Sequence, residues 1–255
     1  MSHALLLRTK IVMTTTTLLA GSILFQSRAE EAKTNQADPP VSITSVITPE
    51  AQPVVVTGSL KGRAPINKAK SARPAKEYSG PSIKVEPADP QVSAVWIGSG
   101  FPALDPAHAP IKRIDQSGYQ FRPALMVVQT GTPVVFPNKD SMYHSVFSYS
   151  DAKSFDLGRF RQDEEPDAVL FDKPGLVQLF CEVHEHMRAS LIVVDTPWFV
   201  CTQPDGSFEI SGITPGKYTA TIWLSAKKSF EQVIEIAAGK TLEVEWSNLV
   251  ETPAP

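Results

Sequence analysis

The chain has 255 residues, of which 42% are hydrophobic, so it is long enough for one large or two modest domains with ordinary cores. Its formal net charge of −3 argues against nucleic-acid binding, which requires a basic surface. With 22 prolines and 14 glycines breaking runs of valine, isoleucine and threonine, the composition favours an all-β fold rich in turns.

The first 29 residues have the features of a secretory signal. Arg8 and Lys10 precede an apolar stretch over residues 11–25, and Ser27-Arg28-Ala29 offers small residues at a cleavage site. We expect cleavage after Ala29 and a periplasmic or secreted mature chain. An uncleaved membrane anchor is the alternative, but the apolar run is short for a bilayer span, and no later segment could form one. The mature chain keeps 21 basic and 27 acidic residues, a net charge of about −6 that is compatible with a cationic redox partner.

The rest of the chain divides into five segments. Residues 30–52 lack periodicity and predict a disordered lead. Residues 53–90 predict a short strand followed by a flexible basic insertion, which contains Lys68, Lys70, Arg73 and Lys76. We expect a first β-module at 91–196, a second at 197–250, and a tail at 251–255. Within 91–196, short apolar runs separated by turn residues predict a Greek-key sandwich.

Four residues with metal-binding side chains follow the apolar strands of the first module. Cys181, His184 and Met187 occur at i, i+3 and i+6 after the strand 176–180, and His144 follows the strand 134–136. One thiolate, two imidazoles and a thioether can form a blue-copper site, with His, His and Cys in a plane and Met as a weak axial ligand. The sequence therefore predicts one type 1 copper per chain.

Several alternatives apply to these residues. Cys181 can be a small buried hydrophobic residue, or half of a Cys–His nucleophile pair. Zinc also binds Cys and His, although a structural zinc site rarely uses Met. A disulfide with Cys201 is disfavoured because the intervening strand carries the chain about 20 Å away. His186 is expected to be an exposed neighbour of the ligand loop, with a redundant ligand or a pH-sensitive group as the alternatives.

The two ligand segments resemble those of the cupredoxins, most closely the amicyanin-like ones. In that family the loop reads Cys-x-x-His-x-x-Met-Arg, as it does here from Cys181 to Arg188, and the upstream segment from Phe136 to His144 also matches. The resemblance implies copper on His144, Cys181, His184 and Met187. Ser145 departs from the usual Asn after the first ligand. The backbone N–H at that position can still donate to the Cys sulfur, but the side-chain tether between the two loops is altered.

The segment 197–250 has a different pattern. Residues 205–218 match Asp-Gly-x-Phe-x-Ile-x-Gly-Ile-x-Pro-Gly-x-Tyr, which resembles a transthyretin-like module of the carboxypeptidase-regulatory type, sometimes classed as carbohydrate-binding-like. Trp198, Trp223 and Trp246 could stack on a sugar, but a core role is the more economical interpretation.

The combination of signal, copper domain and second module resembles bacterial periplasmic proteins labelled methylamine-utilisation proteins, which does not assign methylamine as a substrate. The resemblance implies an electron carrier rather than an enzyme. Its partner would be a redox protein such as a cytochrome c or a periplasmic dehydrogenase. His184 would be the electron port, with Glu182 and Glu185 favouring cationic partners. The alternatives are a copper-delivery protein that does not cycle, or a non-redox interaction module.

Overall fold

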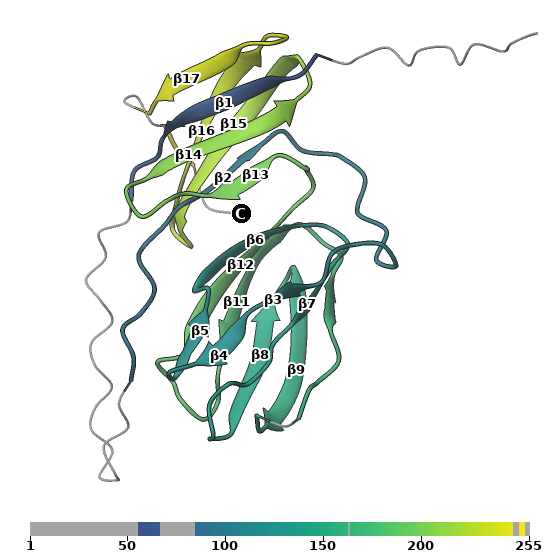
Figure 1. The fold of residues 1–255 in the computed structure, drawn as a ribbon, viewed down its shortest axis with the longest axis vertical. Coiled ribbons are helices and arrows are strands. Elements are labelled where there is room, and N and C mark those ends of the chain that lie inside the picture. Colours follow the sequence, from purple (N-terminus) through teal and green to yellow (C-terminus); the bar gives the residue numbers. More distant parts are fainter. Residues whose placement is uncertain (1–55, 67–84, 163, 247–249, 253–255) are drawn as a thin grey trace, which may run out of the picture. The chain divides into compact units, whose positions relative to one another are not determined.

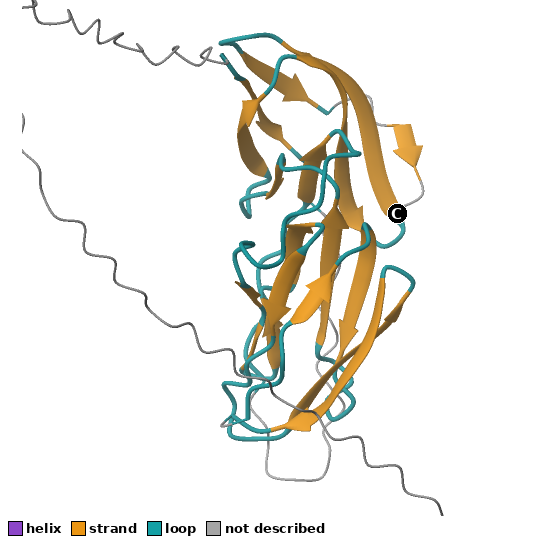
Figure 2. Ribbon diagram, turned by 90° about the vertical axis from the view of Figure 1, so that its right-hand side faces the viewer, coloured by secondary structure: helices purple, strands orange, loops and turns teal. Residues whose placement is uncertain are grey.

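The computed structural model describes residues 56–66, 85–162, 164–246 and 250–252. All regular secondary structure in these ranges is β-strand, which confirms the all-β prediction (Figure 2). Within the same ranges, no helix is long and apolar enough to cross a bilayer. The expected signal, the lead at 30–52 and the basic insertion lie outside the described residues.

The strands between residues 112 and 194, here called the first module, form two sheets and a hairpin (Figure 1). One sheet has the strand order β6-β12-β11-β8-β9, the other has the order β10-β7-β3, and β4 pairs with β5. The strands are β3 (Lys112–Arg113), β4 (Asp115–Ser117), β5 (Gln120–Arg122), β6 (Leu125–Gln129), β7 (Thr132–Val135), β8 (His144–Ser150), β9 (Lys153–Phe160), β10 (Val169–Phe171), β11 (Gly175–Phe180) and β12 (Arg188–Val194).

Side chains that alternate along these strands fill one core. In β11, Val177 and Leu179 are fully buried and separated by the half-buried Gln178, as expected when alternate side chains face the sandwich interior. Phe121, Phe136 and Phe171, which are among the largest fully buried side chains, are at most 1% exposed. The same core includes Cys181 and Met187, so two of the predicted ligands are anchored in the packed interior.

Strand β12 is buried on both faces. Leu191 and Val193 belong to the first module's core, whereas Ile192 and Val194 join a separate apolar cluster that includes Ala94 and Trp223. A strand that is covered on both sides reads as a continuous apolar run, as the sequence from Leu191 to Val194 does.

The second module contains the remaining strands, in sheets of order β14-β1-β17 and β13-β2-β15-β16-β18. They are β1 (Gly58–Arg63), β2 (Ala94–Ile97), β13 (Phe199–Cys201), β14 (Ser207–Ile213), β15 (Gly216–Ser225), β16 (Lys228–Ile236), β17 (Thr241–Glu245) and β18 (Val250–Thr252). Trp198, Trp223 and Trp246 are all at least 92% buried, which favours the core role for these rings.

The strand pairing differs from the expected order of segments along the chain. β1 pairs with β14 and β17, and β2 pairs with β13 and β15. Both strands therefore lie in sheets with strands of the 197–250 segment, and the second module includes residues from before residue 197. Strand β18 also reaches Thr252, inside the expected tail. These pairings join residues far apart in sequence, so local periodicity does not specify them.

Both cysteines are free, and β12 separates them as the disulfide argument required. Cys201 occupies a half-buried position in the short strand β13. Burial raises the pKa of the Cys201 thiol to about 11, so this cysteine stays a neutral thiol at physiological pH.

Replacing Gly131 should destabilise the first module. Gly131 has a φ of +89°, and a Cβ there would lie 2.2 Å from the carbonyl oxygen of Leu104. Gly100 has a φ of +78° with nothing within 4 Å of the added atom. Gly100→Ala should therefore cost about 1–2 kcal/mol of unfolding free energy for its left-handed backbone, and Gly131→Ala clearly more. Urea unfolding of both variants measures the difference, and equal losses would contradict the steric explanation.

Candidate metal centre

The antiparallel pairing of β8 and β11 brings the two ligand segments together at one end of these neighbouring strands. His144 is the first residue of β8, and Cys181 directly follows the last residue of β11. Phe147 pairs with Phe180 across these strands. Because the beginning of one antiparallel strand lies beside the end of its neighbour, His144 and Cys181 are neighbours although 37 residues separate them.

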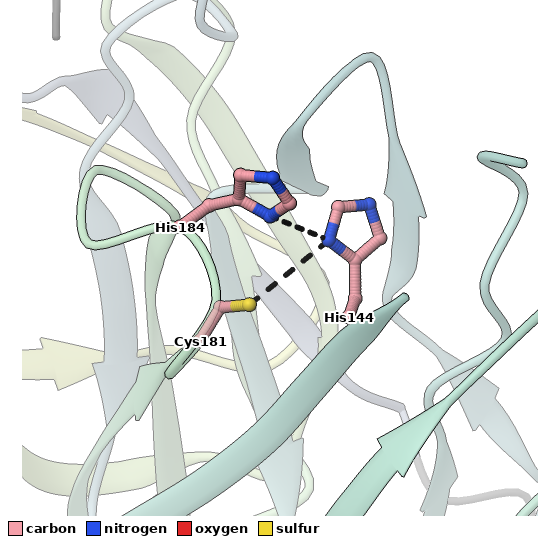
Figure 3. Close-up of side chains that lie close together, drawn as sticks. All are labelled: His144, Cys181 and His184. Carbon is pink, nitrogen blue, oxygen red and sulfur yellow. Dashed lines mark hydrogen bonds between the residues drawn. The ribbon is translucent and has the colours of Figure 1, made fainter. Parts of the chain in front are cut away.

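Three of the four predicted ligands converge. Nδ1 of His144 lies 3.0 Å from Nδ1 of His184 and 4.0 Å from Sγ of Cys181 (Figure 3). The ligand atoms of all three residues lie within 4.8 Å of one another. Imidazole nitrogen and thiolate sulfur bind a metal such as zinc at about 2.0 and 2.3 Å. Both distances measured from Nδ1 of His144 are shorter than the sum of the two bond lengths, so the donor set fits a single ion.

The environment of Cys181 favours its thiolate. Burial acts to raise the pKa of this thiol, but contacts with His144 and with the backbone N–H groups of Ser145, His184 and Val183 outweigh burial and lower the pKa to about 7. The N–H of Ser145 donates to Sγ at 3.4 Å, as the sequence comparison with cupredoxins anticipated. A thiolate is the form that binds a metal.

The two histidines have different electrostatic environments. Burial, together with His144 and His186, lowers the pKa of His184 to about 4. Burial also acts to lower the pKa of His144, but contacts with Cys181 and Asp140 outweigh it and raise the pKa. At neutral pH His184 is therefore an uncharged imidazole, the form that binds metals.

Ser145 supplies a tether between the ligand loops. Its Oγ accepts a hydrogen bond of 2.8 Å from the N–H of Glu182 and lies 3.9 Å from Sγ of Cys181. The Ser145 hydroxyl therefore connects the two ligand loops directly. The sequence showed only that the usual Asn is replaced at this position.

Met187 and His186 complete the ligand loop. Met187 is fully buried in the core that contains Cys181, and its N–H donates to the carbonyl oxygen of His184 at 2.9 Å. His186 is half-buried rather than exposed, and its Nε2 lies 3.0 Å from the carbonyl oxygen of Tyr119. It is not a member of the His144–Cys181–His184 cluster. His186 therefore anchors the loop to the β4–β5 turn.

Sequence reasoning missed two further residues at the site. The ring of Tyr119 makes edge contacts with the rings of both His144 and His184, at centroid distances of 5.7 and 5.0 Å. Oδ2 of Asp140 lies 2.9 Å from Nε2 of His144. Asp140 stands four residues before His144, so a carboxylate close to a predicted ligand was visible in the sequence. Tyr119 is far from both loops in sequence and gave no such signal.

The charges beside His184 are more balanced than the sequence suggested. Glu182 forms a two-pronged ion pair with Arg159, with distances of 2.8 and 3.1 Å. Arg161 lies over the ring of Tyr143 at 4.5 Å. The expected negative surface is therefore partly neutralised, because Glu182 already has a cationic partner.

Three solved structures resemble part of this chain at low sequence identity. No protein-family model and no curated protein matches the chain. A copper-containing nitrite reductase from Thermus scotoductus is similar over 38% of this chain and 28% of its own, with 21% identity and a TM-score of 0.33. A Cu(I) amicyanin mutant is similar over 39% of this chain and 97% of its own, with 18% identity and a TM-score of 0.30. An oxidised amicyanin mutant is similar over 37% of this chain and 91% of its own, with 19% identity and a TM-score of 0.31. The assignment of the site therefore rests on its own donor atoms.

The metal-free protein should lose stability as the pH falls from about 6.5 to about 4. The folded pKa of His184 is about 4 and its ordinary value is 6.5. Between these values the unfolded state binds more protons at this position, so protonation favours unfolding. Urea titrations at several pH values should show a shallower pH slope for His184→Asn than for wild type. An unchanged slope would mean that His184 is not held uncharged.

Proposed function

We propose that this chain is a secreted, periplasmic type 1 copper protein that carries single electrons, with one copper per chain. The convergence of Nδ1 of His144, Nδ1 of His184 and Sγ of Cys181 within 4.8 Å carries the proposal. Two imidazoles and one thiolate are the equatorial donors of blue-copper electron-transfer centres. The proposed role is electron transfer rather than turnover of a substrate.

Each ligand is assigned a role from its surroundings. His144 and His184 hold the metal through Nδ1, the nitrogen that each presents to the other. Cys181 binds as a thiolate and provides the strongest electronic coupling, while the N–H of Ser145 limits the charge on its sulfur. Met187, which is fully buried in the same core as Cys181 and lies on the same short loop, would be the fourth and weakest ligand.

The protein frame keeps the donors in place. When bound, copper would supply one-electron chemistry by alternating between Cu(I) and Cu(II). His144 begins β8, while Cys181 and Met187 lie immediately beside β11 and β12, so three of the donors are fixed to hydrogen-bonded strands. His144, Cys181 and Met187 are at most 4% exposed, which keeps water away from the metal. Donors that move little on electron transfer favour a fast reaction.

The electron port is assigned to His184, the most exposed of the four proposed ligands. Its neighbour in the loop, Val183, is 40% exposed, and Met142 and Tyr143, just before His144, are 47% and 41% exposed. Exposed apolar side chains on both ligand loops provide a surface for brief docking of a redox partner. A cytochrome c or a periplasmic dehydrogenase is the class of partner proposed.

Copper loading tests the donor set directly. The mature protein with one equivalent of Cu(II) should develop the intense blue absorption and narrow copper hyperfine splitting in EPR that accompany a thiolate ligand. Cys181→Ser should abolish the blue absorption because a serine oxygen cannot replace the thiolate coupling. Cys201→Ser is the matched control and should remain blue, since Cys201 is outside the site. A wild-type protein that binds copper without colour would refute the electron-carrier proposal.

Electron self-exchange tests the port. Val183→Glu places a charge on the proposed docking surface, so two copies should repel each other and the self-exchange rate should fall by at least about tenfold. The matched control is Val233→Glu, because Val233 is 74% exposed on β16 of the second module. NMR line broadening in mixtures of the two oxidation states gives the rate. If both variants slow exchange equally, His184 is not the port.

A further inference from the structure

The turn between β4 and β5 lies beside both ligand loops. Gly118 and Tyr119 form a two-residue hairpin turn with φ values of +61° and +60°, and Ser117 pairs with Gln120 across it. Two successive residues with positive φ define a type I′ turn. The N–H groups of Gly118 and Tyr119 both donate to Asp140 rather than across the hairpin.

Asp140 is held from several directions. Its Oδ1 accepts the N–H of Gly118 at 2.8 Å, and its Oδ2 accepts the N–H of Tyr119 at 2.9 Å. Its own N–H donates to Oδ1 of Asn138 at 2.9 Å. The Asp140 side chain is only 15% exposed. A carboxylate with this many fixed partners has little freedom to rotate away from its remaining contact.

That remaining contact is His144. Oδ2 of Asp140 lies 2.9 Å from Nε2 of His144, whose side chain is fully buried. An uncharged imidazole carries one N–H and one lone pair, and an ionised carboxylate can only accept. In the uncharged His144 ring Nε2 therefore carries the hydrogen, and the lone pair is on Nδ1, which faces His184 and Cys181.

We propose that Asp140, held by the Gly118–Tyr119 turn, is a positioning residue that fixes the His144 tautomer and lowers the reduction potential of the site, a role that presupposes the proposed copper function. A carboxylate that accepts the Nε2–H makes the ring a more basic ligand. A more basic ligand stabilises the more highly charged oxidation state, Cu(II), relative to Cu(I). The structure thus places a potential-lowering group on the buried histidine, on the side of the ring away from the half-buried His184.

Asp140→Asn tests this role because an amide has nearly the same shape and no charge. Outer-sphere partners of metal-bound histidines typically change metal affinity 10–100-fold. We expect the preference for Cu(II) over Cu(I) to fall by about tenfold, which is a rise of about 59 mV in the reduction potential of a one-electron couple. The matched control is Asp105→Asn, because Asp105 contacts Nδ1 of His108 at 2.6 Å on the exposed surface.

The outcomes separate this role from the copper function itself. Protein-film voltammetry of the three proteins should show a rise for Asp140→Asn alone, and a shift no larger than that of Asp105→Asn would overturn the proposal. Long-range 15N NMR of the metal-free wild type, at a pH above the pKa of His144, should show the ring with its hydrogen on Nε2. Hydrogen on Nδ1 would overturn the proposal even if the variant did not fold. A wild type with the Nε2–H tautomer that binds no copper would refute the copper function and leave the positioning of His144 by Asp140 supported.

Discussion

The antiparallel pairing of β8 with β11 is the constraint on which the rest of the site depends. It brings His144 beside Cys181, although 37 residues separate them. The loop of seven residues between β11 and β12 then needs only to fold back for His184 to approach both. Backbone hydrogen bonds in a packed sheet fix these positions, so the side chains inherit a geometry that neither loop could maintain alone. The proposed metal-binding chemistry therefore depends on how these two strands pair.

Sequence reasoning identified the members of this cluster because their chemistry is local and unusual. A Cys, a His and a Met at three-residue intervals after an apolar strand restrict the possible functions strongly. The surroundings were harder to predict. His186 was expected to be an exposed neighbour of the ligand loop, yet it is half-buried and contacts a backbone carbonyl of Tyr119, 67 residues away. Glu182 looked like a free surface charge, yet it pairs with Arg159. Contacts of this kind depend on which loops meet in space, and periodicity carries no information about that.

The same limit explains the second module. Its hairpin β15–β16 pairs two strands that are neighbours in the chain. The sequences of β1 and β2 did not indicate which strands they pair with. Ser59 on β1 bonds to Thr241, 182 residues away, and β2 enters a sheet formed largely by strands near the end of the chain. Each strand was recognisable as β, but its place in a sheet was decided by apolar side chains far away in sequence.

The two buried faces of β12 have a mechanical consequence. Leu191 and Val193 pack in the core beneath the ligand loop, while Ile192 and Val194 pack in the cluster with Ala94 and Trp223 of the second module. This strand begins one residue after Met187. A strand that is packed on both faces cannot shift or tilt without disturbing the side-chain packing in both clusters. Side chains of the second module therefore restrict the strand into which the proposed ligand loop leads.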